Sequence, residues 1–146
     1  MTPTIKLVDE PGPEVEEAIG MPLARLNDER VGWPDRRQSL AVTLTAPNSA
    51  EIVGGLWGWT IRGYLHVDLL FVPENFRGIR VGRTLMHQAE QEAIRRGCHS
   101  AWVSTYSFQA PGFYQKLGYR AFGELPDYPL GHSSIFLTKR LVPEAG

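Results

Sequence analysis

The segment 72–84 combines residue types that bind phosphate groups. It holds three arginines at three-residue spacing with two glycines among them: Arg77, Gly78, Arg80, Gly82 and Arg83. Because it joins an apolar run to an amphipathic helix, unpaired backbone N–H groups and the positive end of the helix dipole point at one spot. Glycines let a phosphate approach the backbone closely, and arginines add positive charge. We therefore expect a site for a phosphate-bearing ligand here.

Two other phosphate motifs do not fit this segment. It has no Gly-Lys-Ser/Thr ending, so it is not a nucleotide-hydrolysing P-loop. It also lacks the three glycines that follow the first strand of a dinucleotide-binding unit. Read without further context, the glycines could instead make a turn and the arginines a solvated helix start.

Residues suited to proton transfer lie just before this segment. Asp68 interrupts the apolar run Leu65–Val72, where burial would raise its pKa toward a useful range. His66 lies two residues earlier, so both side chains leave the same face of a strand. An ordinary histidine pKa also suits proton transfer near neutral pH. Asp68, His66 or water could thus serve as a base.

The elements that must position these residues follow from apolar periodicity. Residues at four-residue spacing predict a helix from Val81 that ends at Arg95-Arg96-Gly97. A second helix is predicted near Val15–Leu26, with a break or kink at Gly20 and Pro22, and a brief one over Pro111–Leu117. Strands are predicted at 4–8, 40–45, 52–59, 64–72, 101–105, 119–125 and 134–139. Short turns imply an antiparallel meander, and the crossover helix implies one parallel pair.

Two motifs resemble the GNAT superfamily of N-acetyltransferases. The run Arg77–Gly82 is similar to its pyrophosphate loop, Arg/Gln-x-x-Gly-x-Gly/Ala, with Arg80 in place of the middle glycine. The run Ala110–Tyr119 is similar to Ala-x-x-Phe-Tyr-x-Lys-x-Gly-Phe/Tyr, and Ser107 stands where members usually have asparagine. The resemblance implies an α/β fold of the α+β type. Its sheet would be mixed, mostly antiparallel and about seven-stranded, in one domain over residues 1–146 with helices on both faces.

The resemblance also implies acetyl-CoA as cosubstrate and direct acetyl transfer to a primary amine, with no metal. The pyrophosphate would rest on the Arg77–Gly82 backbone, and the pantetheine arm would pair with Leu70 and Val72 like an extra strand. Tyr114 would face the sulfur as the acid for the leaving thiolate, and Asp68 matches a position that often holds glutamate. The expected cofactor-binding residues are Leu70, Val72, Arg77, Gly78, Ile79, Arg80, Val81, Gly82, Arg83, Thr84 and Ser107.

Composition narrows the classes of partner. A net charge of -1 over 146 residues argues against nucleic acid, and one cysteine, Cys98, excludes an internal disulfide. No apolar run approaches the roughly 20 residues that span a membrane, and no signal peptide is visible, so we expect a cytoplasmic protein. Members of the family are often homodimers, which makes a homodimer possible here.

The acceptor stays open between polyamines, antibiotics, amino acids and a protein amino terminus. Trp33, Trp57, Trp59, Phe108 and His132 could line its pocket, although such aromatic residues more often pack in a core. Three other functions also fit: a non-catalytic acyl-CoA-binding or regulatory domain, transfer of a different acyl group, and an unrelated domain that binds simple phosphate.

Overall fold

The computed structural model describes residues 1–78 and 80–144, and the chain divides into two units, Met1–Arg36 and Arg37–Gly146. In the first unit, helix α1 spans Pro13–Val31, with proline in its first turn and Gly32 in the left-handed conformation after its end. A break or kink was predicted at Gly20 and Pro22, and the helix is not broken there, because α1 runs on through Pro22. The predicted strand at residues 4–8 is also absent. A strand needs a partner for its backbone groups, and this unit offers none.

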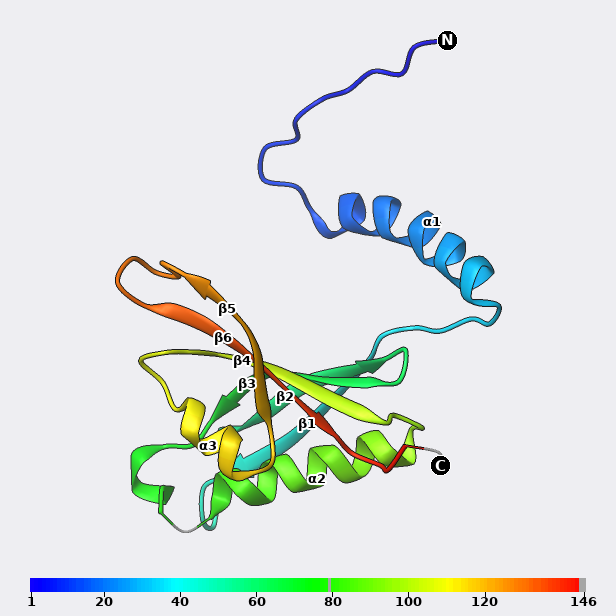
Figure 1. Cartoon of the computed structure of the whole chain (residues 1–146). Coiled ribbons are helices and arrows are strands. Elements are labelled where there is room, and N and C mark those ends of the chain that lie inside the picture. Colours follow the sequence, from blue (N-terminus) through cyan, green and yellow to red (C-terminus); the bar gives the residue numbers. More distant parts are fainter. Residues whose placement is uncertain (79, 145–146) are drawn as a thin grey trace. The chain divides into compact units, whose positions relative to one another are not determined.

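The second unit contains one mixed sheet in the order β1-β2-β3-β4-β6-β5 (Figure 1). Its strands are β1 (Gln38–Thr45), β2 (Ile52–Ile61), β3 (Tyr64–Phe71), β4 (Ser100–Tyr106), β5 (Arg120–Pro126) and β6 (Ser133–Arg140). Among the described strands, the β3–β4 pair alone is parallel, as the crossover predicted, and the other four pairs are antiparallel. The described sheet thus has six strands where about seven were expected, the difference being residues 4–8. Whether residues 1–146 form one domain stays a prediction.

Helix α2 (Val81–Arg95) makes the crossover between the parallel strands, and 3-10 helix η1 (Glu74–Phe76) precedes it. The buried face of α2, including Leu85, Met86 and Ala89, packs on Leu65, Val67, Val103 and Leu137 of the sheet. Helix α3 (Pro111–Lys116) joins the same core through Tyr114. Within the described part of this unit, both helices therefore pack into the same core on one face of the sheet.

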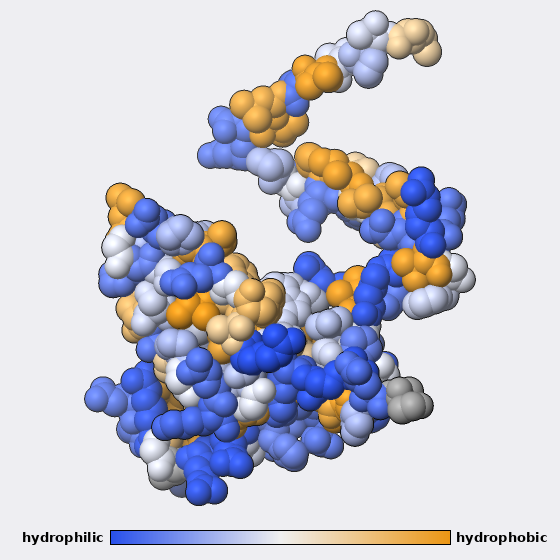
Figure 2. Space-filling model, in the orientation of Figure 1, coloured by the Kyte–Doolittle hydropathy of each residue, from blue (hydrophilic) through white to orange (hydrophobic). Residues whose placement is uncertain are grey.

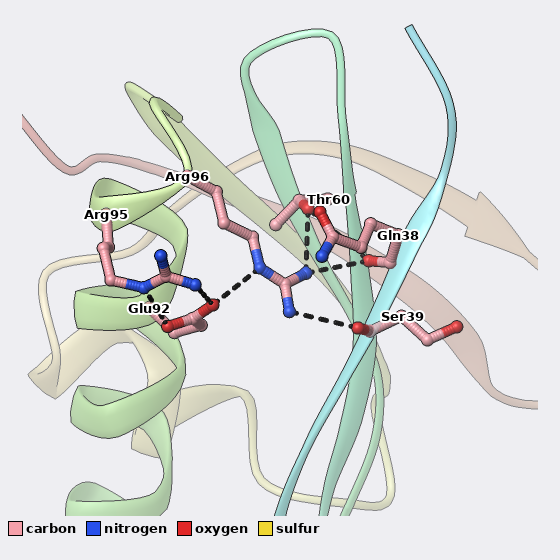
Figure 3. Close-up of polar contacts among 6 residues, drawn as sticks. All are labelled: Gln38, Ser39, Thr60, Glu92, Arg95 and Arg96. Carbon is pink, nitrogen blue, oxygen red and sulfur yellow. Dashed lines mark hydrogen bonds and ion pairs between the residues drawn. The ribbon is translucent and has the colours of Figure 1, made fainter.

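Arg96 fixes the end of α2 to the edge of the sheet (Figure 3). Its guanidinium donates to the backbone oxygens of Gln38 and Ser39, at 3.0 and 3.2 Å, and to the Thr60 hydroxyl at 3.1 Å. Glu92, one turn earlier, accepts from the same guanidinium at 2.8 Å and also pairs with Arg95. Because α2 is fixed at this end, the position of its first turn is set as well.

A buried polar cluster fixes the middle of α2. The Tyr119 hydroxyl donates to Glu90 at 2.7 Å, and Lys139 donates to the other carboxylate oxygen at 3.0 Å. A buried carboxylate needs such partners. The cluster ties α2 to the turn that follows α3, which places α3 beside the start of α2.

Candidate cosubstrate and acyl-transfer site

The parallel strands β3 and β4 separate where β3 bulges. In the described structure they pair only over Tyr64–Val67 and Ser100–Val103. On the other side of β3 the register with β2 passes from Gly58↔Val67 to Trp57↔Leu69, which leaves Asp68 as an extra residue. Such a bulge bends its strand and re-aims a side chain. The end of β3 consequently has backbone groups on its β4 side that can pair with a ligand.

A cavity of about 980 Å³ opens at this separation. Four cationic side chains line it, Arg77, Arg80, Arg83 and Lys116, and no carboxylate lines it among the residues that the structure describes. The other described lining residues are Leu70, Phe71, Val72, Phe76, Gly78, Val81, Gly82, Thr105, Phe108, Gln109, Ala110, Phe113, Tyr114 and Leu117. A cavity with this charge and an apolar wall suits a long ligand with several phosphates and an uncharged arm.

The first turn of α2 faces this cavity through Val81, Gly82 and Arg83. Arg80 precedes that turn and its side chain supplies no cap, so the first N–H groups of the helix are available to an anion. Arg80 adopts φ 63°, a left-handed conformation that glycine adopts more readily. Arg80 thus brings a positive charge to a backbone position that favours glycine.

Gly82 lies where a side chain would be crowded. A Cβ atom there would approach the ring of Phe113 to 3.1 Å. Glycine therefore lets α2 and α3 come this close without a shift of the Phe113 ring. Arg77 is held beside the same wall, because its Nε donates to the Val72 carbonyl at 2.9 Å.

Tyr114 lies in the wall of the cavity and is 8% exposed. Its ring meets the edges or faces of Phe113 and Tyr119 in near-perpendicular contacts, with centroids 5.1 and 6.0 Å away. Burial raises the pKa of the Tyr114 phenol to about 12, so the hydroxyl keeps its proton at neutral pH. A neutral phenol held rigidly beside a cavity can act as a proton donor.

His66 and Asp68 lie next to this cavity's strand but are not among the residues that line it. His66 is 7% exposed and its ring lies between Trp59 and Trp102, with centroids 4.6 and 3.8 Å away. Burial lowers the pKa of His66, and the charge of Asp68 opposes that shift in part. The ring is therefore neutral at pH 7 and able to accept a proton.

The predicted burial of Asp68 is wrong, since its side chain is 44% exposed. The bulge explains this, because it places Asp68 outside the regular alternation of β3. One carboxylate oxygen lies 3.8 Å from Nε2 of His66. The two candidates for the base are thus neighbours, one buried and one exposed.

Three other residues that were expected to bind the cosubstrate are not among the described residues that line the cavity. Thr84 donates from its hydroxyl to the Arg80 carbonyl at 3.1 Å, within the first turn of α2. Ser107 exchanges hydrogen bonds with Ser133, whose N–H donates to the Ser107 hydroxyl at 2.9 Å. Neither residue is among those that line the cavity. Ile79 lies outside the described residues.

Sequence reasoning missed Thr105 and Gln109. The Thr105 hydroxyl donates to the Gln109 side-chain oxygen at 3.1 Å, and the Tyr106 N–H donates to it at 3.0 Å. These contacts close the loop between β4 and α3 against the cavity. A glutamine directly before the Ala110–Tyr119 motif was the available signal, but a single polar residue in a loop is too common to single out.

The described residues contain no group of three or more histidine, cysteine or acidic side chains that could hold a metal ion. None of their helices is both long and apolar enough to cross a membrane.

Comparison with known proteins agrees with this geometry. The model of the acetyltransferase (GNAT) family matches residues 6–119. The acetyltransferase Atu2258 of Agrobacterium fabrum is 39% identical over 87% of this chain and 91% of its own length. The blasticidin-S acetyltransferase of Streptomyces morookaense is 44% identical over 68% of this chain and 74% of its own. A crystal structure of an acetyltransferase from Bacillus cereus superposes with a TM-score of 0.73 at 34% identity, covering 92% of this chain and 97% of that one. The chain therefore belongs to the GNAT family of acetyltransferases.

Proposed function

We propose that this protein transfers the acetyl group of acetyl-CoA directly to a primary amine of a small molecule. One observation carries the proposal: a cation-lined cavity opens where β3 and β4 separate, and Tyr114 lies in its wall. The relative that is 44% identical is named for blasticidin-S, which supports a small-molecule acceptor.

The residues of the cavity fit the cosubstrate of the family. The N–H groups at the start of α2, with Arg77, Arg80 and Arg83, would hold the pyrophosphate. The β4-facing side of β3 at Leu70, and Val72 just after the strand, would hydrogen-bond the amides of the pantetheine arm. When bound, acetyl-CoA supplies a thioester whose carbonyl carbon accepts the amine nitrogen as the carbon–sulfur bond breaks.

Three side chains of this chain would handle the protons. Asp68, exposed at the bulge, would take a proton from the acceptor's ammonium group directly or through water. Neutral His66 would receive or share that proton through its 3.8 Å approach to Asp68. Tyr114 would donate its phenolic proton to the departing sulfur and regain one from solvent.

Thiol release tests the proposal. The protein is incubated with acetyl-CoA and a panel of primary amines, and the release of free thiol is measured. The same reactions are run with propionyl-CoA or succinyl-CoA as the donor for comparison. We expect release that depends on both acetyl-CoA and an amine. Tight CoA binding without release for any amine would mean a non-catalytic binding domain. Faster release from another donor would mean a different acyl group, and displacement of CoA by millimolar inorganic phosphate would mean a simple phosphate site.

A homodimer and a cytoplasmic location also belong to this proposal. They are supported by the family resemblance and by the composition of the chain.

A further inference from the structure

Four aromatic side chains form a cluster that reaches the cavity through Phe108: Tyr106, Phe108, Tyr128 and His132. The rings of Tyr106 and Phe108 are stacked, with centroids 5.0 Å apart and planes 6° apart. Tyr128 stacks on Tyr106 at 5.8 Å and 24°, and His132 meets Phe108 edge-on at 5.0 Å. The cluster joins the end of β4 to the loop between β5 and β6, two parts of the chain that lie far apart in sequence.

Much of this cluster is exposed. Phe108 is 54% exposed and Tyr128 is 50% exposed. Figure 2 shows further apolar side chains among polar ones over the β5–β6 hairpin. Phe108 also lines the cavity beside Tyr114. An exposed aromatic surface that continues into a reactive cavity is more consistent with ligand binding than with core packing.

The chemistry of the surroundings disfavours a linear polycation as acceptor. Such a ligand is recognised by carboxylates along its length. In the proposed function Asp68 serves a single ammonium group. Among the described residues, no carboxylate lines the cavity itself, and Asp127 in the hairpin loop accepts a hydrogen bond from the N–H of Gly131 at 3.4 Å. Nearly parallel rings instead offer their faces to another flat ring.

We propose that the acceptor carries a flat conjugated ring, which stacks on Phe108 and Tyr128 while its amine reaches the acyl group. This inference rests on the proposed function, since it identifies the acceptor of that reaction. The aromatic cluster is then the part of the site that selects the acceptor, and the first turn of α2 is the part that holds the cosubstrate.

Two amines that differ only in the ring test the inference. 2-Phenylethylamine and 2-cyclohexylethylamine have the same chain length and ring size, but only the first is flat. Their dissociation constants are measured by NMR titration of the protein with CoA bound. We expect the aromatic amine to bind about tenfold more tightly. Where turnover is measurable, kcat/KM should show a preference of the same size.

Substitutions locate the preference. Tyr128→Leu and Phe108→Leu should bring the two dissociation constants to within about twofold of each other. Phe122→Leu is the matched control, because Phe122 is 57% exposed on β5 and contacts Phe136 rather than the cluster. It should keep the tenfold preference. Melting curves establish that each variant is folded.

The outcomes separate this inference from the proposed function. Equal dissociation constants for the two amines in the unmodified protein would overturn the inference, and so would tighter binding of spermidine than of either. A tenfold preference that Tyr128→Leu and Phe108→Leu leave intact would also overturn it. If the preference follows the cluster but no amine releases thiol, the cluster binds flat amines as inferred and the proposed transfer is wrong.

Discussion

Tyr114 is held as a neutral phenol because burial raises its pKa to about 12. We predict that Tyr114→Phe, which keeps the ring and its packing, lowers single-turnover thiol release by about ten- to a thousandfold. CoA affinity and melting temperature should change little. The loss should shrink with a donor whose leaving thiol is more acidic, because such a thiolate needs less help. Since the pKa is raised, ionisation of Tyr114 should not limit the rate below about pH 11.

Tyr119→Phe is the matched control for this prediction. It also removes one phenolic oxygen, but from the hydrogen bond to Glu90 at 2.7 Å. It should lower the free energy of unfolding by about 1–3 kcal/mol, because a buried carboxylate loses a partner. Thiol release per folded molecule should stay near the wild-type value. A Tyr114→Phe enzyme with the wild-type rate would assign the acid role to water.

In the proposed mechanism, Asp68 and His66 divide proton transfer between an exposed and a buried group. We predict that Asp68→Asn lowers turnover at pH 7 by about a hundredfold while CoA affinity stays within about twofold. The carboxylate lies on the bulge of β3, outside the lining of the cosubstrate cavity. Rates are measured across pH for Asp68→Asn and His66→Gln. If Asp68→Asn keeps the wild-type dependence of the rate on pH and His66→Gln loses it, His66 is the base.

The pKa of His66 also links this residue to stability. Because burial lowers that pKa, the unfolded chain takes up the proton first as pH falls below about 6.5. Stability should therefore drop between pH 7 and pH 5 in the unmodified protein. We predict a smaller drop in melting temperature for His66→Gln. His87, which is exposed on α2, supplies the control His87→Gln, for which the drop should be unchanged.

At the scale of elements, the junction of β3, α2 and α3 depends on Gly82. We predict that Gly82→Glu abolishes CoA binding, because a carboxylate would repel the pyrophosphate and its Cβ would press on Phe113 at 3.1 Å. Gly82→Ala separates the two effects, since it adds only the Cβ. Isothermal titration should show weakened CoA binding for the Gly82→Ala variant and no CoA binding for the Gly82→Glu variant. Equal CoA affinities for Gly82→Glu and the wild type would mean that the phosphates bind elsewhere.

Elements with strong periodicity were predictable from the sequence, and irregular ones were not. The apolar stripe from Val81 and the glycine after Arg96 gave α2 its correct position, and the crossover gave the parallel β3–β4 pair. The bulge at Asp68 could not be predicted from the sequence, because it depends on the register of β3 with β2 and not on the local pattern of apolar residues. Residues 4–8 alternate like a strand, but alternation does not supply the neighbouring strand that hydrogen bonding needs.

At the scale of the whole molecule, the first unit leaves apolar side chains uncovered within itself. Ile19, Leu23 and Leu26 lie at helical spacing on α1 and are 67%, 54% and 43% exposed. The apolar pattern predicted this stripe correctly, but it carries no information on what the stripe contacts. The second unit has a core of its own, which holds the elements of the candidate site in place.

Ligand binding to the folded protein alone should appear as a rise in melting temperature. At a CoA concentration one hundred times Kd, the stabilisation is about 2.7 kcal/mol. For a chain of this size that corresponds to a shift of about 10 °C, measured by calorimetry. Because four cations line the cavity, the shift should shrink as salt is raised from low to physiological concentration.

Pantetheine, which keeps the arm and lacks the phosphates, is the control and should give almost no shift. An unmoved melting curve with saturating CoA would contradict the cosubstrate site, whereas an equal shift with pantetheine would mean that the arm, and not the arginines, supplies the binding energy.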